Sequence, residues 1–480
     1  MSRNTFVSLW ITAKLSTAAD RRMHLPFALK QAGCMTHNLS AGSQVPGAVP
    51  GPAAAGAVQS ASAPQPDTRR QADSAPDAAR TRRAATQAST PKSRRKPPAN
   101  RARRSAATAG HIRSAPERRV RIGSPTALLA AVPVLLQFQP GSSMVVIGTE
   151  PPGSQVRLTL RYDLPDPPDP ALAAEIAAHA VAVLAAQRIN RAAAVGYGPG
   201  HLVTPVADAL RAWAPSAGIT VAELLRVENR RYWSYLCAEP GCCPPEGTPF
   251  DVSGHPAARA LAAGGAARVL SSRAELAATV APLDGDAGEA MRRATRQAEE
   301  HVARLVSRVA MSGRRASARR LIATAGLQAV GTAIARYRRG ESVGPEIAAW
   351  LTVVLRDLRV RDDAWSRMQP EYLEAHLRLW TDLTRMARPG YASAPASLLA
   401  FVAWQSGNGA LANVALDRAL TDDPGYSMAV LLRQVLDSGA PPSLARLPMT
   451  PEEVAASYDD LETTHDEDGQ RDTDDAAGQP

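Results

Sequence analysis

Aromatic residues, cysteines and long apolar runs are all scarce in this chain of 480 residues. Aromatics make up 4% of the sequence, and there are only four cysteines. Cys34 stands alone and the other three are clustered, which is not the pattern of a secreted disulfide framework. No run approaches the roughly 18–20 apolar residues of a membrane span, and the apolar stretch from Phe6 to Ile11 lacks the cleavage site of a signal peptide. We therefore expect a cytoplasmic protein without a membrane partner.

The charge is distributed unevenly along the chain. Residues 1–122 carry 21 Lys and Arg against 5 Asp and Glu, whereas residues 451–480 carry 11 acidic groups against Arg471 alone. The middle, 123–450, has 33 basic and 29 acidic groups. The overall charge of +10 therefore arises mainly from the tails. It is weak support for nucleic-acid binding by the folded part.

Both ends of the chain are predicted to be disordered tails. Residues 1–122 are rich in Ala, Pro and Arg and show no periodic apolar face. The basic cluster from Pro91 to Arg104 is suited to non-specific contact with phosphates. A solvated tail, or sequence upstream of the true start, is favoured because no aromatic residues interleave to stack on bases. Residues 446–480 form the acidic tail.

Residues 123–280 predict an α/β domain, with a mixed sheet and flanking helices. A helix is expected over 127–132, ending at Pro133, and another is expected to begin at Asp169-Pro170 with Asp169 as its cap. The segment 156–162 alternates apolar and polar residues, as in a strand with one wet face. Further extended segments are expected at 144–148, 192–197 and 221–235.

Residues 285–445 predict an all-α domain, because apolar residues recur every three or four positions from Gly288 onward. Arginines coat its first two helices, and a solvated face is favoured there over a binding groove. Over 396–424, small residues and a closing proline are spaced as in one tetratricopeptide-like helical hairpin: Gly407, Ala412, Ala419 and Pro424.

The most informative stretch runs from Arg231 to Gly247. It gathers three aromatics in four residues, and its prolines indicate a rigid loop beside strand ends, where an α/β fold usually places a ligand. The hypothesis is a pocket at the seam between the sheet and the helical domain, lined by Tyr232, Trp233, Tyr235 and Glu246.

The same stretch contains Cys237, Cys242 and Cys243, which leave several mechanisms open. Three thiolates plus His255 would satisfy zinc, although adjacent cysteines do not easily share one tetrahedral ion. A reversible disulfide, or nucleophilic catalysis assisted by His255 or Glu246, is also open. Burial as small apolar side chains is the favoured interpretation. No cofactor is assigned, and zinc is the one candidate.

Several separated blocks together resemble a bacterial family defined by a domain of unknown function, DUF4192, over about residues 124–445. The blocks occur in the same order as in that family: Leu128–Pro133, Phe138–Gly148, Tyr232–Gly247, Val360–Trp365 and Leu398–Tyr426. The resemblance implies that residues 124–445 form one unit, and it implies no particular chemistry.

For function we expect a non-enzymatic module that binds a ligand, or a protein through its helical domain. The rival is an enzyme of unassigned reaction with its site at the Tyr232–Glu246 loop. Nucleic-acid association through the basic N-terminal arm is a weaker third hypothesis.

Overall fold

The computed structural model describes residues 123–150, 155–263, 268–310, 315–444 and 450–459. The predicted basic tail and most of the predicted acidic tail lie outside these residues. No helix in the described ranges is long and apolar enough to cross a membrane.

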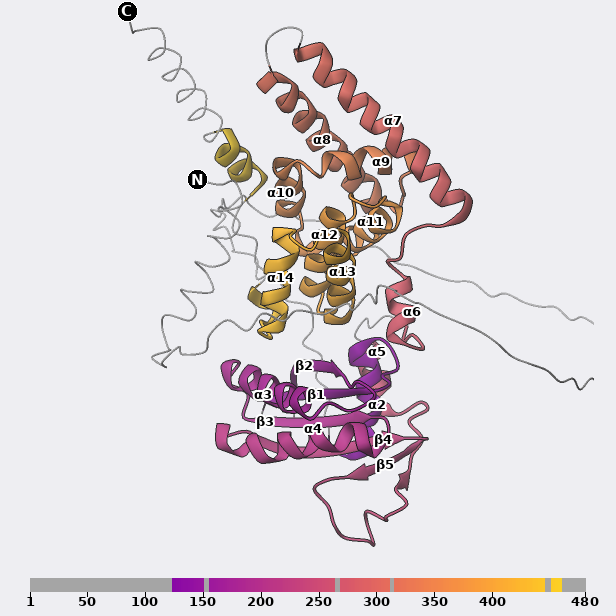
Figure 1. Cartoon of the computed structure of the whole chain (residues 1–480), viewed down its shortest axis with the longest axis vertical. Helices are drawn as coiled ribbons and strands as arrows, with labels where there is room; N and C mark the ends of the chain where they lie inside the picture. The colour runs from indigo at the N-terminus through magenta and orange to yellow at the C-terminus, as the bar shows by residue number, and fades with distance from the viewer. Residues whose placement is uncertain (1–122, 151–154, 264–267, 311–314, 445–449, 460–480) are drawn as a thin grey trace, which may run out of the picture. The chain divides into compact units, whose positions relative to one another are not determined.

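The N-terminal half is built on a mixed sheet with the strand order β2-β1-β3-β4-β5-β6 (Figure 1). β1 runs antiparallel to β2 and β3, β3 runs parallel to β4, and β4 to β6 are antiparallel neighbours. The strands are β1 Ser143–Glu150, β2 Gln155–Asp163, β3 Arg191–Tyr197, β4 Thr220–Glu228, β5 Arg231–Ser234 and β6 Thr248–Pro249. The predicted mixed α/β sheet is confirmed.

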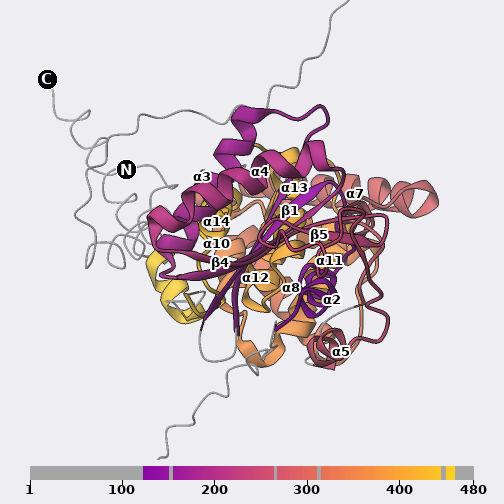
Figure 2. The same ribbon diagram turned by 90° about the horizontal axis from the view of Figure 1, so that it is seen from below.

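Each face of the sheet carries its own apolar core, because successive side chains of a strand point to opposite faces. Met144 and Val146 of β1 pack with α3 (Pro170–Ala186) and α4 (Gly200–Trp213), which cover one face (Figure 2). α4 approaches β3 so closely that a Cβ on Gly196 would come within 2.1 Å of Val203 Cγ1. The opposite face packs into a second and larger core.

Local sequence sets the start of one helix, whereas burial sets the end of another. Asp169 caps α3 as expected, since its Oδ1 accepts a hydrogen bond from the Ala171 amide at 2.9 Å. The first helix, α2 (Pro125–Leu136), does not end at Pro133 as predicted. Nine of its twelve residues are buried, so apolar burial outweighs the hydrogen bond that the proline removes.

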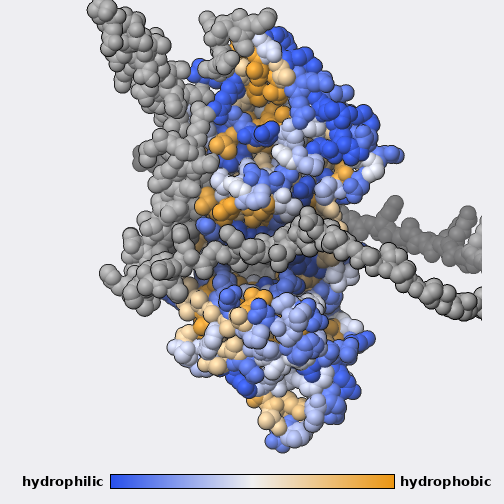
Figure 3. Space-filling view, viewed as in Figure 1, coloured by the Kyte–Doolittle hydropathy of each residue, from blue (hydrophilic) through white to orange (hydrophobic). Residues whose placement is uncertain are grey.

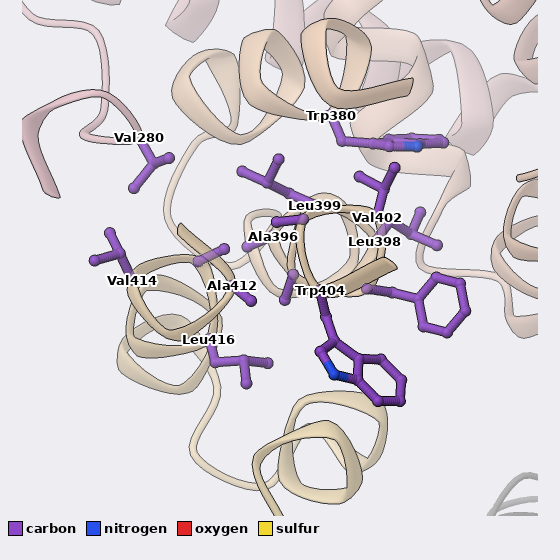
Figure 4. Close-up of a cluster of buried hydrophobic side chains, with 14 of the residues drawn as sticks. Val280, Trp380, Ala396, Leu398, Leu399, Val402, Trp404, Ala412, Val414 and Leu416 are labelled. Carbon is purple, nitrogen blue, oxygen red and sulfur yellow. The ribbon is translucent and has the colours of Figure 1, made fainter. Parts of the chain in front are cut away.

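The C-terminal half is helical, as predicted, with a short helical region leading into it. Its elements are α5 Pro256–Ala263, α6 Arg273–Ala278, α7 Gly285–Ala310, α8 Arg315–Arg338, α9 Pro345–Val354, α10 Leu358–Ser366, α11 Leu373–Met386, α12 Ser393–Gln405, α13 Gly409–Asp422 and α14 Ser427–Asp437. α12 and α13 pack closely and form the expected helical hairpin, whose kinship with tetratricopeptide units stays a prediction. Leu399 and Leu416 of this hairpin and Trp380 of the neighbouring α11 are fully buried (Figure 4).

The two predicted domains share one apolar core. Val145 and Val195 of the sheet belong to the same buried cluster as Leu399 of α12. A hydrogen bond of 2.8 Å from Asn408 Nδ2 to Gln137 Oε1 also joins the halves. The sheet and the helices therefore form a single packed unit.

A further helix over 451–459 lies inside the segment predicted to be a disordered acidic tail. Its start is fixed by a capping box: the Glu453 amide donates to Thr450 Oγ1, and Glu453 Oε2 accepts from the Thr450 amide. Tyr458 donates to Asp362 Oδ2 of α10 at 2.6 Å. Order in this chain thus extends past residue 450, because local capping and contacts to α10 hold the helix over 451–459.

Candidate metal centre

The three clustered cysteines lie in the connection between β5 and β6, here called the thiol loop (residues 235–247). β5 and β6 are the outermost strands at their side of the sheet, and the loop extends beyond them (Figure 1). Its hydrogen bonds go to β4, to β5, to α4 and to itself. The sequence placed this loop at the seam between sheet and helical domain. This placement is wrong, because the loop leaves the β5–β6 end of the sheet and is held by the sheet and α4.

Trp233 and Arg231 of β5 hold the far end of the loop. Arg226 Cζ lies over the Trp233 indole, 3.7 Å from the centroid of the indole ring. Trp233 Nε1 donates a hydrogen bond to the Pro245 carbonyl at 2.9 Å. Arg231 Nη1 donates to the Gly247 carbonyl at 2.6 Å. The Pro245–Gly247 end of the loop is thereby attached to the sheet.

Two backbone-capping contacts hold the other end and bring the thiols together. Ser234 Oγ accepts hydrogen bonds from the amides of Leu236 and Cys237, both at 3.2 Å. The Glu239 carbonyl accepts from the amides of Cys242 and Cys243 at 3.1 and 2.8 Å. This turn reverses the chain between Cys237 and Cys242.

The three sulfur atoms form a compact triangle. Cys237 Sγ lies 3.1 Å from Cys242 Sγ, and Cys242 Sγ lies 3.5 Å from Cys243 Sγ. All three lie within 4.8 Å of one another. Thiolates around tetrahedral zinc, with Zn–S near 2.3 Å, stand about 3.8 Å apart. The three sulfurs therefore lie close enough together to share one ion, although Cys242 and Cys243 are adjacent in sequence.

The triangle favours one thiolate flanked by two donors. The pKa of Cys237 is lowered by hydrogen bonds from the Cys242 and Cys243 thiols and from the Glu239 backbone amide. The hydrogen bond to Cys237 raises the pKa of Cys242, and with burial it raises that of Cys243 to about 12. A cation bound by all three sulfurs would instead lower the pKa of every thiol, since each ligand binds as a thiolate.

With this geometry in place, comparison with known proteins identifies the family. The family model described as a domain of unknown function, DUF4192, matches residues 125–443. The chain belongs to the DUF4192 family. No curated protein and no solved structure shows significant similarity to it.

Two other sequence-predicted site residues of this DUF4192 protein do not join the thiols. His255 precedes α5, and its Nδ1 accepts the Ala257 amide at 3.2 Å. Within the ranges that the structure covers, the group of potential metal ligands contains the three cysteines and not His255. Glu246 has an exposed side chain, and its backbone carbonyl accepts from Arg231.

The predicted aromatic pocket is divided between the two faces of the sheet. Tyr232 packs with Phe250 on the face that adjoins the larger core. Tyr235 packs with the core under α4, where its hydroxyl hydrogen-bonds to Thr204 Oγ1 at 2.8 Å. Trp233 lies on this second face, paired with Arg226. Alternation along β5 separates the side chains, so they do not line a single pocket.

Sequence reasoning missed the residues that build the loop. Arg226, Arg231 and Ser234 provide its contacts, but nothing in their spacing distinguishes them from ordinary strand residues. The strand register, which pairs Arg226 with Trp233, supplies the missing information.

Replacing Gly247 with alanine should loosen the thiol loop. Gly247 has a φ of +82°, and an added Cβ would lie 2.5 Å from the Trp233 indole. We expect a loss of about 1–3 kcal/mol in stability, together with weaker metal binding. Thermal denaturation and zinc titration would measure both. Gly241→Ala is the matched control, because a Cβ there meets nothing within 4 Å. Equal behaviour of the two variants would contradict the role of Trp233 as an anchor.

Proposed function

We propose that this DUF4192 protein is a binding module that holds a thiophilic metal ion, with zinc as the expected species, at Cys237, Cys242 and Cys243. The observation that carries the proposal is the convergence of three sulfurs within 4.8 Å in a loop attached to the sheet at both ends. Thiolate ligands select zinc or copper(I) over hard cations.

Three protein ligands leave one coordination position for water or for a donor from a partner. The loop lies at the sheet edge, and Cys242 is exposed, so that position faces solvent. This supports a module that presents a metal-stiffened loop to a partner. An enzyme site at the same loop stays a prediction that would need a cleft, and the split of the aromatics removes the cleft expected there.

A metal titration of the full-length protein tests the proposal. The reduced protein would be titrated with zinc against a chromophoric chelator, and with cobalt(II) to detect sulfur-to-metal charge transfer. We expect one ion per chain, with an affinity that falls as the pH is lowered, because binding displaces thiol protons. Cys237→Ser, Cys242→Ser and Cys243→Ser should each weaken binding by at least about tenfold, which is about 1.4 kcal/mol.

Cys34→Ser is the matched control, since it removes the one cysteine outside the loop. Retention of binding in all three loop variants would overturn the proposal. So would a chain that takes up no ion and loses two hydrogens on mild oxidation, with a disulfide mapped to Cys237 and Cys242. That outcome would favour a dithiol redox site, which the 3.1 Å separation also permits.

A further inference from the structure

The α7–α8 hairpin carries an unusual excess of positive charge. Residues 301–340, which span its distal half and the whole of α8, contain nine arginines and no Asp or Glu. Arg304 and Arg308 of α7 are exposed, as are Arg319 and Arg320 of α8. Arg304 pairs with Glu300 at 3.6 Å and Arg319 with Asp357, the N-cap residue of α10, at 3.2 Å, so the hairpin is not without acidic partners. The acidic residues of α7 all precede residue 301, and the charge of residues 301–340 stays strongly positive.

The hairpin also exposes apolar side chains. Val306 of α7 and Leu321 of α8 are 42% and 52% exposed. Hydrophilic surface runs along α7, with an apolar strip beside it near the end of the hairpin (Figure 3). A helix pair that mixes arginines with exposed aliphatic groups is suited to an acidic polypeptide.

The end of the described chain lies close to this hairpin. The last helix, 451–459, is attached to α10 by an ion pair of 2.9 Å between Asp459 and Arg359. α10 in turn packs on α8, where Arg319 Nε lies 3.2 Å from Asp357 Oδ2. Asp459, the last described residue, therefore lies at the N-terminal end of α10, which contacts the first turns of α8.

The segment that continues from this point has the complementary charge. Residues 460–480 contain eight acidic residues and one arginine. Twenty-one residues can span up to about 70 Å when extended. In each of α7 and α8, the twenty or so residues nearest the connection between the two helices span roughly 30 Å. The segment is long enough to reach the whole basic face.

We propose that residues 460–480 bind in cis to the basic face of α7 and α8, which is the surface formed by the exposed Arg304, Arg308, Arg319 and Arg320. The contact is electrostatic and therefore sensitive to salt. It shields the hairpin from other polyanions, and an acidic partner of higher affinity gains access by displacing the segment. This inference is independent of the metal site.

Zero-length carbodiimide crosslinking on the full-length protein tests the proposal, because it joins carboxylates to amines in direct contact. All four lysines of the chain lie in residues 1–122, so the hairpin has no native amine to react. Arg308→Lys and Arg304→Lys place one there with the charge retained. At low salt we expect crosslinks between these lysines and acidic residues of 460–480, lost at high salt. Arg259→Lys, on the exposed side of α5, is the matched control and should give none.

Crosslinks from the segment to Lys92 or Lys96 alone would overturn the proposal in favour of pairing with the basic N-terminal arm. A second measurement uses heparin as the polyanion probe. Deleting 460–480 should strengthen heparin binding by about tenfold, and Arg304→Glu with Arg308→Glu in the deleted chain should remove that gain. An unchanged affinity on deletion would also overturn the proposal.

Discussion

Replacing Asp362 with alanine should lower the free energy of unfolding by about 3–5 kcal/mol, because it leaves a buried guanidinium without its counter-ion. The Arg361 side chain is 2% exposed, and its Nε and Nη2 donate to Asp362 Oδ1 at 2.8 and 2.5 Å. Asp362 also accepts the Tyr458 hydroxyl, so the same change weakens the attachment of the 451–459 helix. Urea denaturation of the full-length protein would measure the loss.

Two comparisons make this prediction specific to the buried charge. Asp459→Ala removes an exposed carboxylate that pairs with the part-buried Arg359 and should cost less, about 1 kcal/mol, since the carboxylate itself is solvated. Replacing both buried partners, Arg361→Met with Asp362→Leu, should cost less than Asp362→Ala alone, since no charge is then stranded. If the double variant were the less stable of the two, the penalty would come from packing and not from an unpaired charge.

The contacts of Arg361 also show which features could be predicted from the sequence and which could not. Val360–Trp365 and the segment ending at Tyr426 are two of the blocks that carry the family resemblance. The structure brings the two blocks together, since the Arg361 guanidinium lies 5.9 Å from the Tyr426 ring centroid. Neither block reveals this contact by itself. A buried arginine beside two aspartates looks, in sequence, like part of a solvated helix face.

Elements whose signals are local were predictable. The Asp169 cap, the alternation over 156–162 and the closely spaced extended segments of 221–235 each depend on neighbours within a few residues. The capping box at Thr450 and Glu453 was equally local and was overlooked within an acidic composition.

The candidate site depended on information of a different kind. The sequence identified the three cysteines, but their convergence requires a turn around the Glu239 carbonyl. The place of the loop at a sheet edge follows from strand order, which is set by long-range pairing and not by propensity. The prediction of an aromatic pocket was wrong for the same reason. The face of the sheet on which each β5 side chain lies is fixed only when β5 pairs with β4.

Acidification from about pH 7.5 to pH 4 should destabilise the protein through His376 by up to about 3 kcal/mol. This side chain is 1% exposed and stacks on Trp380 in α11. Burial, reinforced by the nearby charge of Arg338, lowers its pKa from 6.5 to about 4. The unfolded chain therefore takes up a proton near pH 6.5, whereas the folded chain resists until about pH 4. Stability is lost across that interval as the pH falls.

His376→Leu removes the titrating group while keeping an apolar side chain of similar volume in the core. Its free energy of unfolding should fall less than that of the wild type between pH 7.5 and pH 4, and the difference between the two proteins should change by about 3 kcal/mol. His201→Gln, at an exposed position of α4, is the matched control and should follow the wild type. Parallel curves for wild type and His376→Leu would mean that the imidazole is hydrated or paired in solution, and the acid sensitivity would then have to be sought in the carboxylates.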